Sequence, residues 1–367
     1  MLSYSWIFMG SKDKIRILVV GCGHMGASHA RAYQQLEGFE IAGLVSRSPE
    51  SREKLSVKLG GLPVYSDYAS ALELTKPDAV SVNTYPDTHY EYVKMALTAG
   101  AHVFVEKPLA ESVRKAEELI ALAIKNNRKL IVGYILRVHP AWKRFIEIAK
   151  TLGKPLVMRM NLNQQSSGAQ WYTHKQLMRS MSPIVDCGVH YVDVMCLMTQ
   201  SEPVSVSAIG ARLSDEIDLE MYNYGQLQVR FRDGSVGWYE AGWGPMMSET
   251  AFFVKDVIGP NGCVSITDTK LKSSDNVEGH TRTGALKIHF SALDKEGEFL
   301  KKDDFISTEH EPDHDQLCLL EQQVFLDAIQ QNSDLSGHLT DAVNSLKVVL
   351  AADESVKTGK TISLQIS

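Results

Sequence analysis

Residues Ile15–Gly26 read Ile-Arg-Ile-Leu-Val-Val-Gly-Cys-Gly-His-Met-Gly, and this stretch decides the fold of the chain. The apolar run 17–20 predicts a parallel strand that is buried on both faces. A G-x-G-x-x-G pattern follows at once, and a helical pattern begins at His24. Glycines in this order permit a tight turn, close approach of the backbone to a pyrophosphate, and close packing of the helix on the strand. The expected dinucleotide contacts here are Gly21, Gly23, His24, Met25 and Gly26.

Length and composition set the broad class of the protein. A chain of 367 residues is long enough for two domains, and 44% hydrophobic with 22% charged residues is typical of a soluble globular protein. The net charge of −6 disfavours nucleic acid and anionic membranes as partners. Five cysteines without a C-x-x-C pair favour a reducing compartment and argue against disulfides or a cysteine zinc site.

The sequence shows no clear targeting segment. No apolar run approaches the roughly 20 residues that span a bilayer. Residues 1–13 contain a short apolar patch, but they lack the basic start and the small-residue cleavage site of a signal peptide. We therefore expect a loose N-terminal arm over 1–13 and a cytoplasmic protein.

Residues 14–137 alternate short apolar segments with helical ones, which predicts a doubly wound parallel sheet of the dinucleotide-binding kind. The predicted strands are 16–20, 40–45, 79–84, 102–105 and 129–133, and the predicted helices are 24–36, 49–59, 88–99 and 111–127.

Residues 138–367 show a different pattern of apolar and polar residues. Apolar and polar residues alternate over 157–162 and 225–231, and an Asp-Gly pair at 233–234 predicts a hairpin. Helices are expected over 183–199, 314–331 and 340–357. These patterns predict an α+β domain with a large, mostly antiparallel open sheet. The open face of that sheet makes a homo-oligomer the expected state.

The residues after the second predicted strand bear on the choice between NAD and NADP. An acid about 20 residues past the last glycine would accept from the ribose 2′-hydroxyl, but here Ser46-Arg47-Ser48 stand before the first acid, Glu50. The serines can bond a 2′-phosphate, and Arg47 can pair with it. Alternatively, Arg47 is a solvated loop residue and NAD binds, so both cofactors stay open.

Two further segments follow strands whose carboxyl ends should meet at the ligand-binding edge of the sheet. They are Asn83–His89 and Glu106–Pro108, where Pro108 stiffens the turn and is suited to a cis bond. Lys107 is expected to emerge beside the reacting group, although a strand-end lysine is commonly only a surface charge. The predicted cofactor contacts in these segments are Thr84, Pro86, His89, Glu106 and Lys107.

Asp186 and His190 are four residues apart, so on a helix they share one face. A carboxylate one turn from an imidazole orients the ring and raises its proton affinity. A neutral histidine is well suited to take a hydroxyl proton near pH 7. The competing interpretation is a helix-surface pair or a buried histidine with ordinary partners.

The glycine turn, the segments 84–89 and 99–108, Asp186–His190 and the closing stretch 340–360 together resemble the Gfo/Idh/MocA oxidoreductase family. The resemblance implies a Rossmann domain followed by a domain with a large antiparallel sheet, often in a dimer or tetramer. It also implies NAD(P)-dependent oxidation or reduction of a ring carbon in a sugar, a glycoside (carbon 3 in some relatives) or a cyclitol. Lys107, Asp186 and His190 would then be the catalytic residues, with either Lys107 or His190 as the base.

The same resemblance leaves two alternatives. One is a glycosidase that uses tightly held NAD without net redox change, and the other is a nucleotide-binding regulator without catalysis. This chain has Arg179–Pro183 where family members commonly carry a glycine-rich turn, so the substrate stays open. Whether the cofactor exchanges at each turnover or stays tightly bound is also open.

Several aromatic and basic residues are candidate substrate contacts, because aromatic faces suit a sugar ring and Arg or His suits its hydroxyls. Ordinary packing is the alternative for each. Residues 309–315 look like a metal cluster, but Asp313 is a good helix N-cap, so no metal is expected. The candidate substrate contacts are Tyr134, Arg137, Trp171, Tyr172, His174 and His314, together with Asp186 and His190.

Overall fold

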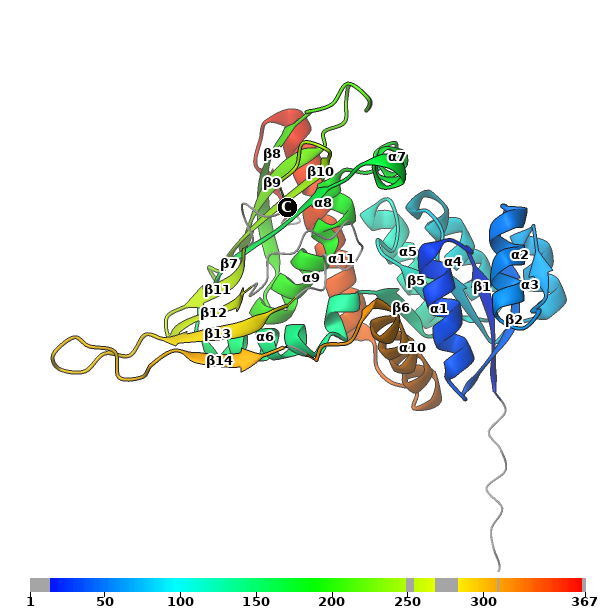
Figure 1. Cartoon of the computed structure of the whole chain (residues 1–367), viewed down its shortest axis with the longest axis horizontal. Helices are drawn as coiled ribbons and strands as arrows, with labels where there is room; N and C mark the ends of the chain where they lie inside the picture. Colours follow the sequence, from blue (N-terminus) through cyan, green and yellow to red (C-terminus); the bar gives the residue numbers. More distant parts are fainter. Residues whose placement is uncertain (1–13, 249–253, 268–282, 309, 365–367) are drawn as a thin grey trace, which may run out of the picture.

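The computed structural model describes residues 14–248, 254–267, 283–308 and 310–364 (Figure 1). The arm predicted over 1–13 lies outside the described residues. The chain forms two sheets, one of six strands and one of nine. This confirms the predicted fold class, a doubly wound parallel sheet joined to a mostly antiparallel one.

The six-stranded sheet has the order β3-β2-β1-β4-β5-β6, and every neighbouring pair is parallel. The strand order reverses beside β1, which is where open α/β sheets bind ligands. Its strands are β1 (Ile15–Val20), β2 (Phe39–Val45), β3 (Val64–Tyr65), β4 (Ala79–Val82), β5 (His102–Glu106) and β6 (Leu130–Gly133). Its helices are α1 (His24–Gln35), α2 (Pro49–Lys58), α3 (Tyr68–Thr75), η1 (Pro86–Thr88), α4 (His89–Thr98), α5 (Val113–Lys125) and η2 (Ile135–Arg137).

The five strands and four helices predicted for this region occur within two residues of their expected bounds. Residues 17–20 of β1 are at most 2% exposed, as a strand buried on both faces requires. The sequence patterns missed β3 and α3. The former has only two residues, and a strand so short leaves no periodic signal.

The nine-stranded sheet has the order β14-β13-β12-β11-β7-β10-β9-β8-β15. Only β7 and β10 pair in parallel among its neighbouring strands. The predicted Asp-Gly hairpin is confirmed between β9 and β10, where Gly234 adopts a φ of +85°. The strands are β7 (Val157–Gln165), β8 (Pro203–Ala211), β9 (Tyr224–Phe231), β10 (Val236–Gly244), β11 (Lys255–Gly259), β12 (Gly262–Thr267), β13 (Ala285–Phe290), β14 (Asp304–Ser307) and β15 (Ile362–Ser363).

The helix predicted over 183–199 is divided in two, which corrects that prediction. The N–H of His190 donates to the carbonyl of Cys187, an i→i+3 bond that tightens the chain and separates α8 from α9. The helices of this half are α6 (Pro140–Thr151), α7 (Gly168–Leu177), α8 (Pro183–Asp186), α9 (Gly188–Thr199), α10 (His314–Gln330) and α11 (Ser336–Thr358).

Helix α10 returns from the second half of the chain to the first sheet, and Figure 1 shows it beside α1. Phe325 is fully buried there and stacks on Phe39 with ring centres 6.0 Å apart. His338 of α11 accepts a hydrogen bond from the N–H of Val132 in β6. The C-terminal helices therefore complete the core of the parallel half, and a division at 137/138 stays a prediction. In the described part of the chain, no helix combines the length and apolarity needed to cross a membrane.

Candidate active site

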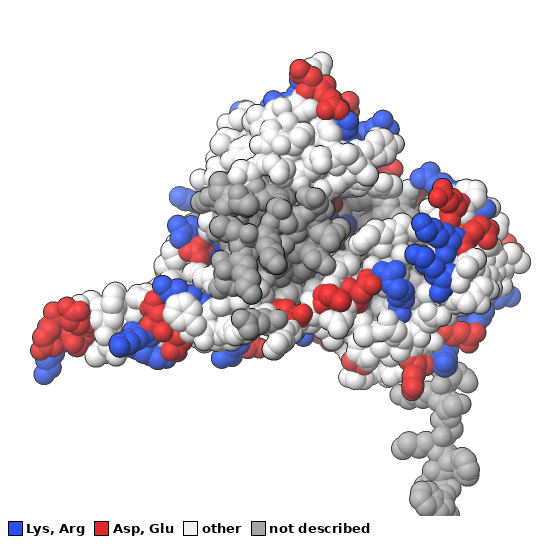
Figure 2. All heavy atoms as spheres, in the orientation of Figure 1, with Lys and Arg blue, Asp and Glu red and all other residues white. Residues whose placement is uncertain are grey.

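A cavity of about 880 Å³ lies between the two halves of the molecule, and Figure 2 shows the hollow that separates them. Its walls come from the glycine turn, the carboxyl ends of β2, β4, β5 and β6, and the helices α7 to α10. Predicted dinucleotide contacts and all three predicted catalytic residues line this one cavity.

The glycine turn has the local geometry that a pyrophosphate requires. Gly21 has a φ of +93°, and a Cβ on Gly26 would lie 1.8 Å from the carbonyl oxygen of Gly21. A Cβ on Gly23 would meet nothing within 4 Å, and this residue faces the cavity. No side chain caps the start of α1, so its first N–H groups are open to the cavity. The turn therefore fits a dinucleotide phosphate.

Another part of the cavity wall is formed by the residues that follow β2. Ser46 accepts a hydrogen bond from the N–H of Ser48 through its hydroxyl, at 3.3 Å. Ser48 is the N-cap of α2 and accepts from the N–H of Ser51. Arg47 lines the cavity and is exposed. A hydroxyl thus occupies the position where an acid would bind a ribose 2′-hydroxyl.

Lys107 and Asp186 form a buried ion pair in the wall of the cavity. The ammonium of Lys107 donates to Oδ1 of Asp186 at 2.8 Å and to its carbonyl oxygen at 3.1 Å. The two side chains are only 16% and 12% exposed. Burial opposes the charge on Lys107, but the neighbouring carboxylate of Asp186 outweighs it and raises the pKa of the lysine. The peptide bond between Lys107 and Pro108 is cis.

Glu106 is held by a chain of three buried side chains. The hydroxyl of Tyr33 donates to the amide oxygen of Gln322 at 2.6 Å, and the amide nitrogen lies 2.8 Å from Nδ1 of His29. Nδ1 is therefore the acceptor, and Nε2–H donates to Glu106 Oε1 at 2.8 Å. Burial alone would raise the pKa of Glu106, but the His29 hydrogen bond and the charge of Lys107 lower it.

His190 of α9 and His174 of α7 lie at the end of the cavity that these two helices form. His190 is 6% exposed and meets the ring of Tyr134 edge-on, with centroids 5.9 Å apart. His174 stacks on Trp243 at 4.5 Å and bonds the Ser166 hydroxyl through Nδ1. Burial lowers the pKa of His174 to about 4, so its ring is neutral at physiological pH. This end offers an aromatic face beside neutral polar groups.

Most of the predicted site residues meet in this one cavity. The predicted residues that line it are Gly21, Gly23, His24, Met25, Ser46, Arg47, Thr84, Pro86, Glu106, Lys107, His174, Asp186, His190 and His314. Gly26 lies behind the turn, against Gly21.

The other five predicted contacts do not line the cavity, and four of them have structural partners instead. Arg137 bonds both carboxylate oxygens of Asp193 and also reaches Asp341, while the hydroxyl of Tyr134 bonds Ser345. Nε1 of Trp171 donates to the carboxylate of Glu216, and the two ring nitrogens of His89 bond the carbonyls of Thr84 and Pro108. Tyr172 is 61% exposed. The residues that do not line the cavity are therefore Tyr134, Arg137, Trp171, Tyr172 and His89.

Gln164, Trp243 and Glu321 are among the cavity residues that have no counterpart in the sequence predictions. Gln164 is the penultimate residue of β7 and accepts from Nε1 of Trp243 at 2.7 Å. Glu321 lies in the middle of α10. None belongs to a local motif, and each reaches the cavity only through tertiary packing.

The residues before α10 act as a helix start, as predicted. Asp313 accepts from the N–H of Gln316, whose side chain accepts in return from the N–H of Asp313. Glu311 pairs with His139 at 2.8 Å, and Glu309 lies outside the described residues. This segment does not assemble into a metal centre among the residues described.

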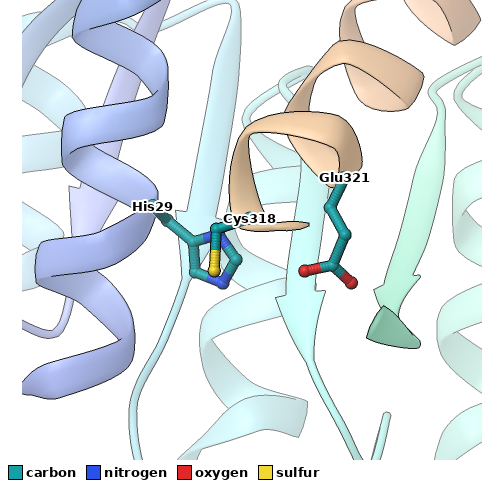
Figure 3. Close-up of side chains that lie close together, drawn as sticks. All are labelled: His29, Cys318 and Glu321. Carbon is teal, nitrogen blue, oxygen red and sulfur yellow. The ribbon is translucent and has the colours of Figure 1, made fainter. Parts of the chain in front are cut away.

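A different trio could be taken for a metal site. The possible ligand atoms of His29, Cys318 and Glu321 lie within 4.8 Å of one another (Figure 3). Both ring nitrogens of His29 already have partners in Glu106 and Gln322. Burial raises the pKa of the Cys318 thiol, which disfavours the thiolate that binds metal. We assign no metal to this trio.

Comparison with known proteins agrees with this geometry. Residues 15–134 match the model of the Gfo/Idh/MocA oxidoreductase family with an NAD-binding Rossmann fold, and residues 143–255 match the Gfo/Idh/MocA C-terminal domain. UDP-N-acetylglucosamine 3-dehydrogenase of Acidithiobacillus ferrooxidans is 30% identical over 56% of this chain and 61% of its own length. Scyllo-inositol 2-dehydrogenase (NAD(+)) of Bacillus subtilis is 25% identical over 97% and 98%.

A solved structure is similar over nearly the whole chain. Scyllo-inositol dehydrogenase from Lactobacillus casei, with bound NAD(H) and scyllo-inositol, superposes with a TM-score of 0.75 and 20% identity. The match covers 95% of this chain and 99% of that one. At this identity the likeness establishes the fold. The alignments with several curated relatives are shorter and span about 53 to 61% of their length.

Substitutions at two glycines of the turn should separate an effect on cofactor binding from an effect on folding stability. Gly23→Ala places its methyl group in open space facing the cavity, so we expect an unchanged melting temperature and weaker binding of NAD. Gly26→Ala drives its methyl group into a backbone carbonyl, so we expect a lower melting temperature without any cofactor. Thermal melts and titration calorimetry measure both. Equal melting temperatures for the two variants would contradict the assigned roles.

Proposed function

This chain belongs to the Gfo/Idh/MocA oxidoreductase family, and from that premise we propose that it is an NAD(P)-dependent dehydrogenase of a hydroxylated ring. The substrate class is a sugar, a glycoside or a cyclitol, oxidised at a secondary hydroxyl or reduced at the corresponding ketone. The observation that carries the proposal is the buried pair of Lys107 and Asp186, which lies in one cavity with the glycine turn and His190.

The bound cofactor supplies the nicotinamide carbon that accepts or donates the hydride. Two of the three N–H groups of Lys107 go to Asp186, which leaves one to hold the substrate oxygen. A protonated lysine at that oxygen stabilises developing negative charge. We assign the proton transfer to His190, because the ion pair keeps Lys107 protonated and removes it as a base near neutral pH. Asp186 positions the lysine and stands four residues before the histidine, across the break between α8 and α9.

The substrate class is supported by the relatives and by the shape of the pocket. The relatives named above act on inositols or on a UDP-linked amino sugar. In this chain, His174 and Trp243 present a stacked aromatic surface beside Gln164. Such a surface suits the apolar face of a hydroxylated ring, and the amide and imidazole suit its hydroxyls.

The turn after β2 supports the use of NADP as well as NAD. Ser46, Arg47 and Ser48 line the cavity where the adenosine ribose would lie, and none of them repels a 2′-phosphate. The family model and the solved relatives concern NAD, so we propose that this chain accepts both dinucleotides.

We also propose that the chain self-associates through the nine-stranded sheet. Ile258, Val157 and Val236 are register neighbours on β11, β7 and β10, and each is between 36% and 38% exposed. A row of apolar side chains on an open sheet face is typical of a protein interface.

The cofactor assignment predicts the effect of Ser46→Asp. A carboxylate at this position accepts from a ribose 2′-hydroxyl and repels a 2′-phosphate, so the ratio of the Kd for NADP to the Kd for NAD should rise by roughly tenfold or more. Titration calorimetry with both dinucleotides measures the ratio. Glu50, four residues on, offers a control as Glu50→Gln, which should leave the ratio unchanged.

The catalytic assignment predicts the loss caused by His190→Ala and Lys107→Met. General acid–base and electrostatic groups contribute ~10²-fold or more, so each variant should lower kcat by at least that factor. The assay follows reduced nicotinamide and released aglycone over a panel of inositols and glucosides. His310→Ala, an exposed histidine, serves as the control. Turnover within a few-fold of wild type in both variants would exclude the assignment, and aglycone release without net reduction would indicate a glycosidase.

The interface proposal predicts an oligomer that one charge can dissociate. Light scattering should give the mass of a dimer or larger assembly for the natural chain. Val157→Lys puts an ammonium in the middle of the apolar row and should yield monomers. Val57→Lys, on an exposed position of α2, should leave the mass unchanged. A monomeric natural chain would refute the proposal.

A further inference from the structure

One buried carboxyl in the cavity has no part in the chemistry proposed above. Glu321 of α10 is 5% exposed and lines the cavity together with Glu106 and Gly133. Within the described ranges, its carboxyl makes no hydrogen bond and no ion pair. Figure 3 shows it hanging from α10 on the side of the helix that faces His29. A buried polar group without a protein partner points to a ligand that completes it.

The charge state of Glu321 differs from that of its neighbour. Burial and the negative charge of Glu106 both raise the pKa of Glu321 well above its usual range, which favours the neutral, protonated form of this carboxyl. Glu106 stays ionised through its hydrogen bond from His29. A neutral carboxyl donates through its O–H and accepts through its C=O. It therefore matches a group that carries one acceptor and one donor side by side.

We propose that Glu321 binds the carboxamide of the nicotinamide ring, an inference that rests on the proposed dehydrogenase function. A primary amide presents one carbonyl and one NH₂, which is the complement of a neutral carboxylic acid. The ring has to lie between the glycine turn, which receives the phosphates, and Lys107, which receives the substrate oxygen. Glu106 directly precedes Lys107, and Glu321 faces the cavity beside Glu106.

Glu321 also serves to orient the ring. A carboxamide fixed at one end of the cavity keeps the ring from turning over about its bond to the ribose, and therefore determines which face meets Lys107 and His190. The carboxyl comes from α10, and Phe325 anchors that helix in the core of the parallel half. The residue is thus a binding residue for the cofactor on a rigid element.

The test compares two dinucleotides by titration calorimetry. NAD carries the primary amide, whereas 3-acetylpyridine adenine dinucleotide carries a methyl ketone in its place. The natural protein should bind NAD about tenfold more tightly, because the ketone loses one hydrogen bond and leaves a buried acceptor unpaired. Glu321→Leu should abolish that preference, and Glu321→Gln, which keeps a donor and an acceptor, should retain most of it. Glu147→Leu, an exposed residue of α6, is the matched control and should behave as the natural protein.

The outcomes separate the two proposals. Equal affinity of the natural protein for both dinucleotides overturns the role of Glu321 and leaves the dehydrogenase function standing, as does an unchanged preference in Glu321→Leu. No binding of either dinucleotide overturns both. The comparison on the natural protein needs no substitution, so it decides the matter even if circular dichroism shows that Glu321→Leu does not fold.

Discussion

The ion pair between Lys107 and Asp186 is the interaction on which the rest of the site depends. Lys107 follows β5 of the parallel sheet, and Asp186 ends α8 beside the antiparallel one, so the pair joins the two halves of the molecule. Two buried charges are stable only together, and loss of one partner leaves the other uncompensated. The same contact that ties the halves together therefore places a cationic group on the wall of the cavity.

The parallel half is incomplete without the C-terminal helices. Glu106 owes its orientation and its charge to His29, and the tautomer of His29 is set by Gln322 on α10. A residue more than 200 positions away along the chain thus controls the carboxylate that directly precedes Lys107. This coupling joins the two halves of the chain, which look separable in sequence, in one polar network.

Features that depend on neighbouring residues could be predicted from the sequence. The glycine turn, the Asp-Gly hairpin and the N-cap at Asp313 all arise from local backbone requirements, and all three are confirmed. Features that depend on distant partners could not. The sequence predicted Arg137 as a substrate contact, but its guanidinium forms ion pairs with Asp193 of α9 and Asp341 of α11. No local sequence pattern reveals how these two helices pack. Glu321 shows the reverse case, because a residue in an ordinary helical stretch is brought to the cofactor cavity only by the return of α10.

The charges around the reacting centre persist over a wide pH range, which bears on the identity of the base. The raised pKa of Lys107 keeps its contribution to folding present in full below the ordinary lysine pKa, and this contribution is lost only as pH rises through the higher folded value. The lowered pKa of Glu106 has the opposite sign, so its contribution is lost only as pH falls through a value below that of a free glutamate. Burial keeps His174 neutral by lowering its pKa to about 4. A change of turnover near neutral pH therefore does not originate in these three groups, which agrees with the assignment of the proton transfer to His190.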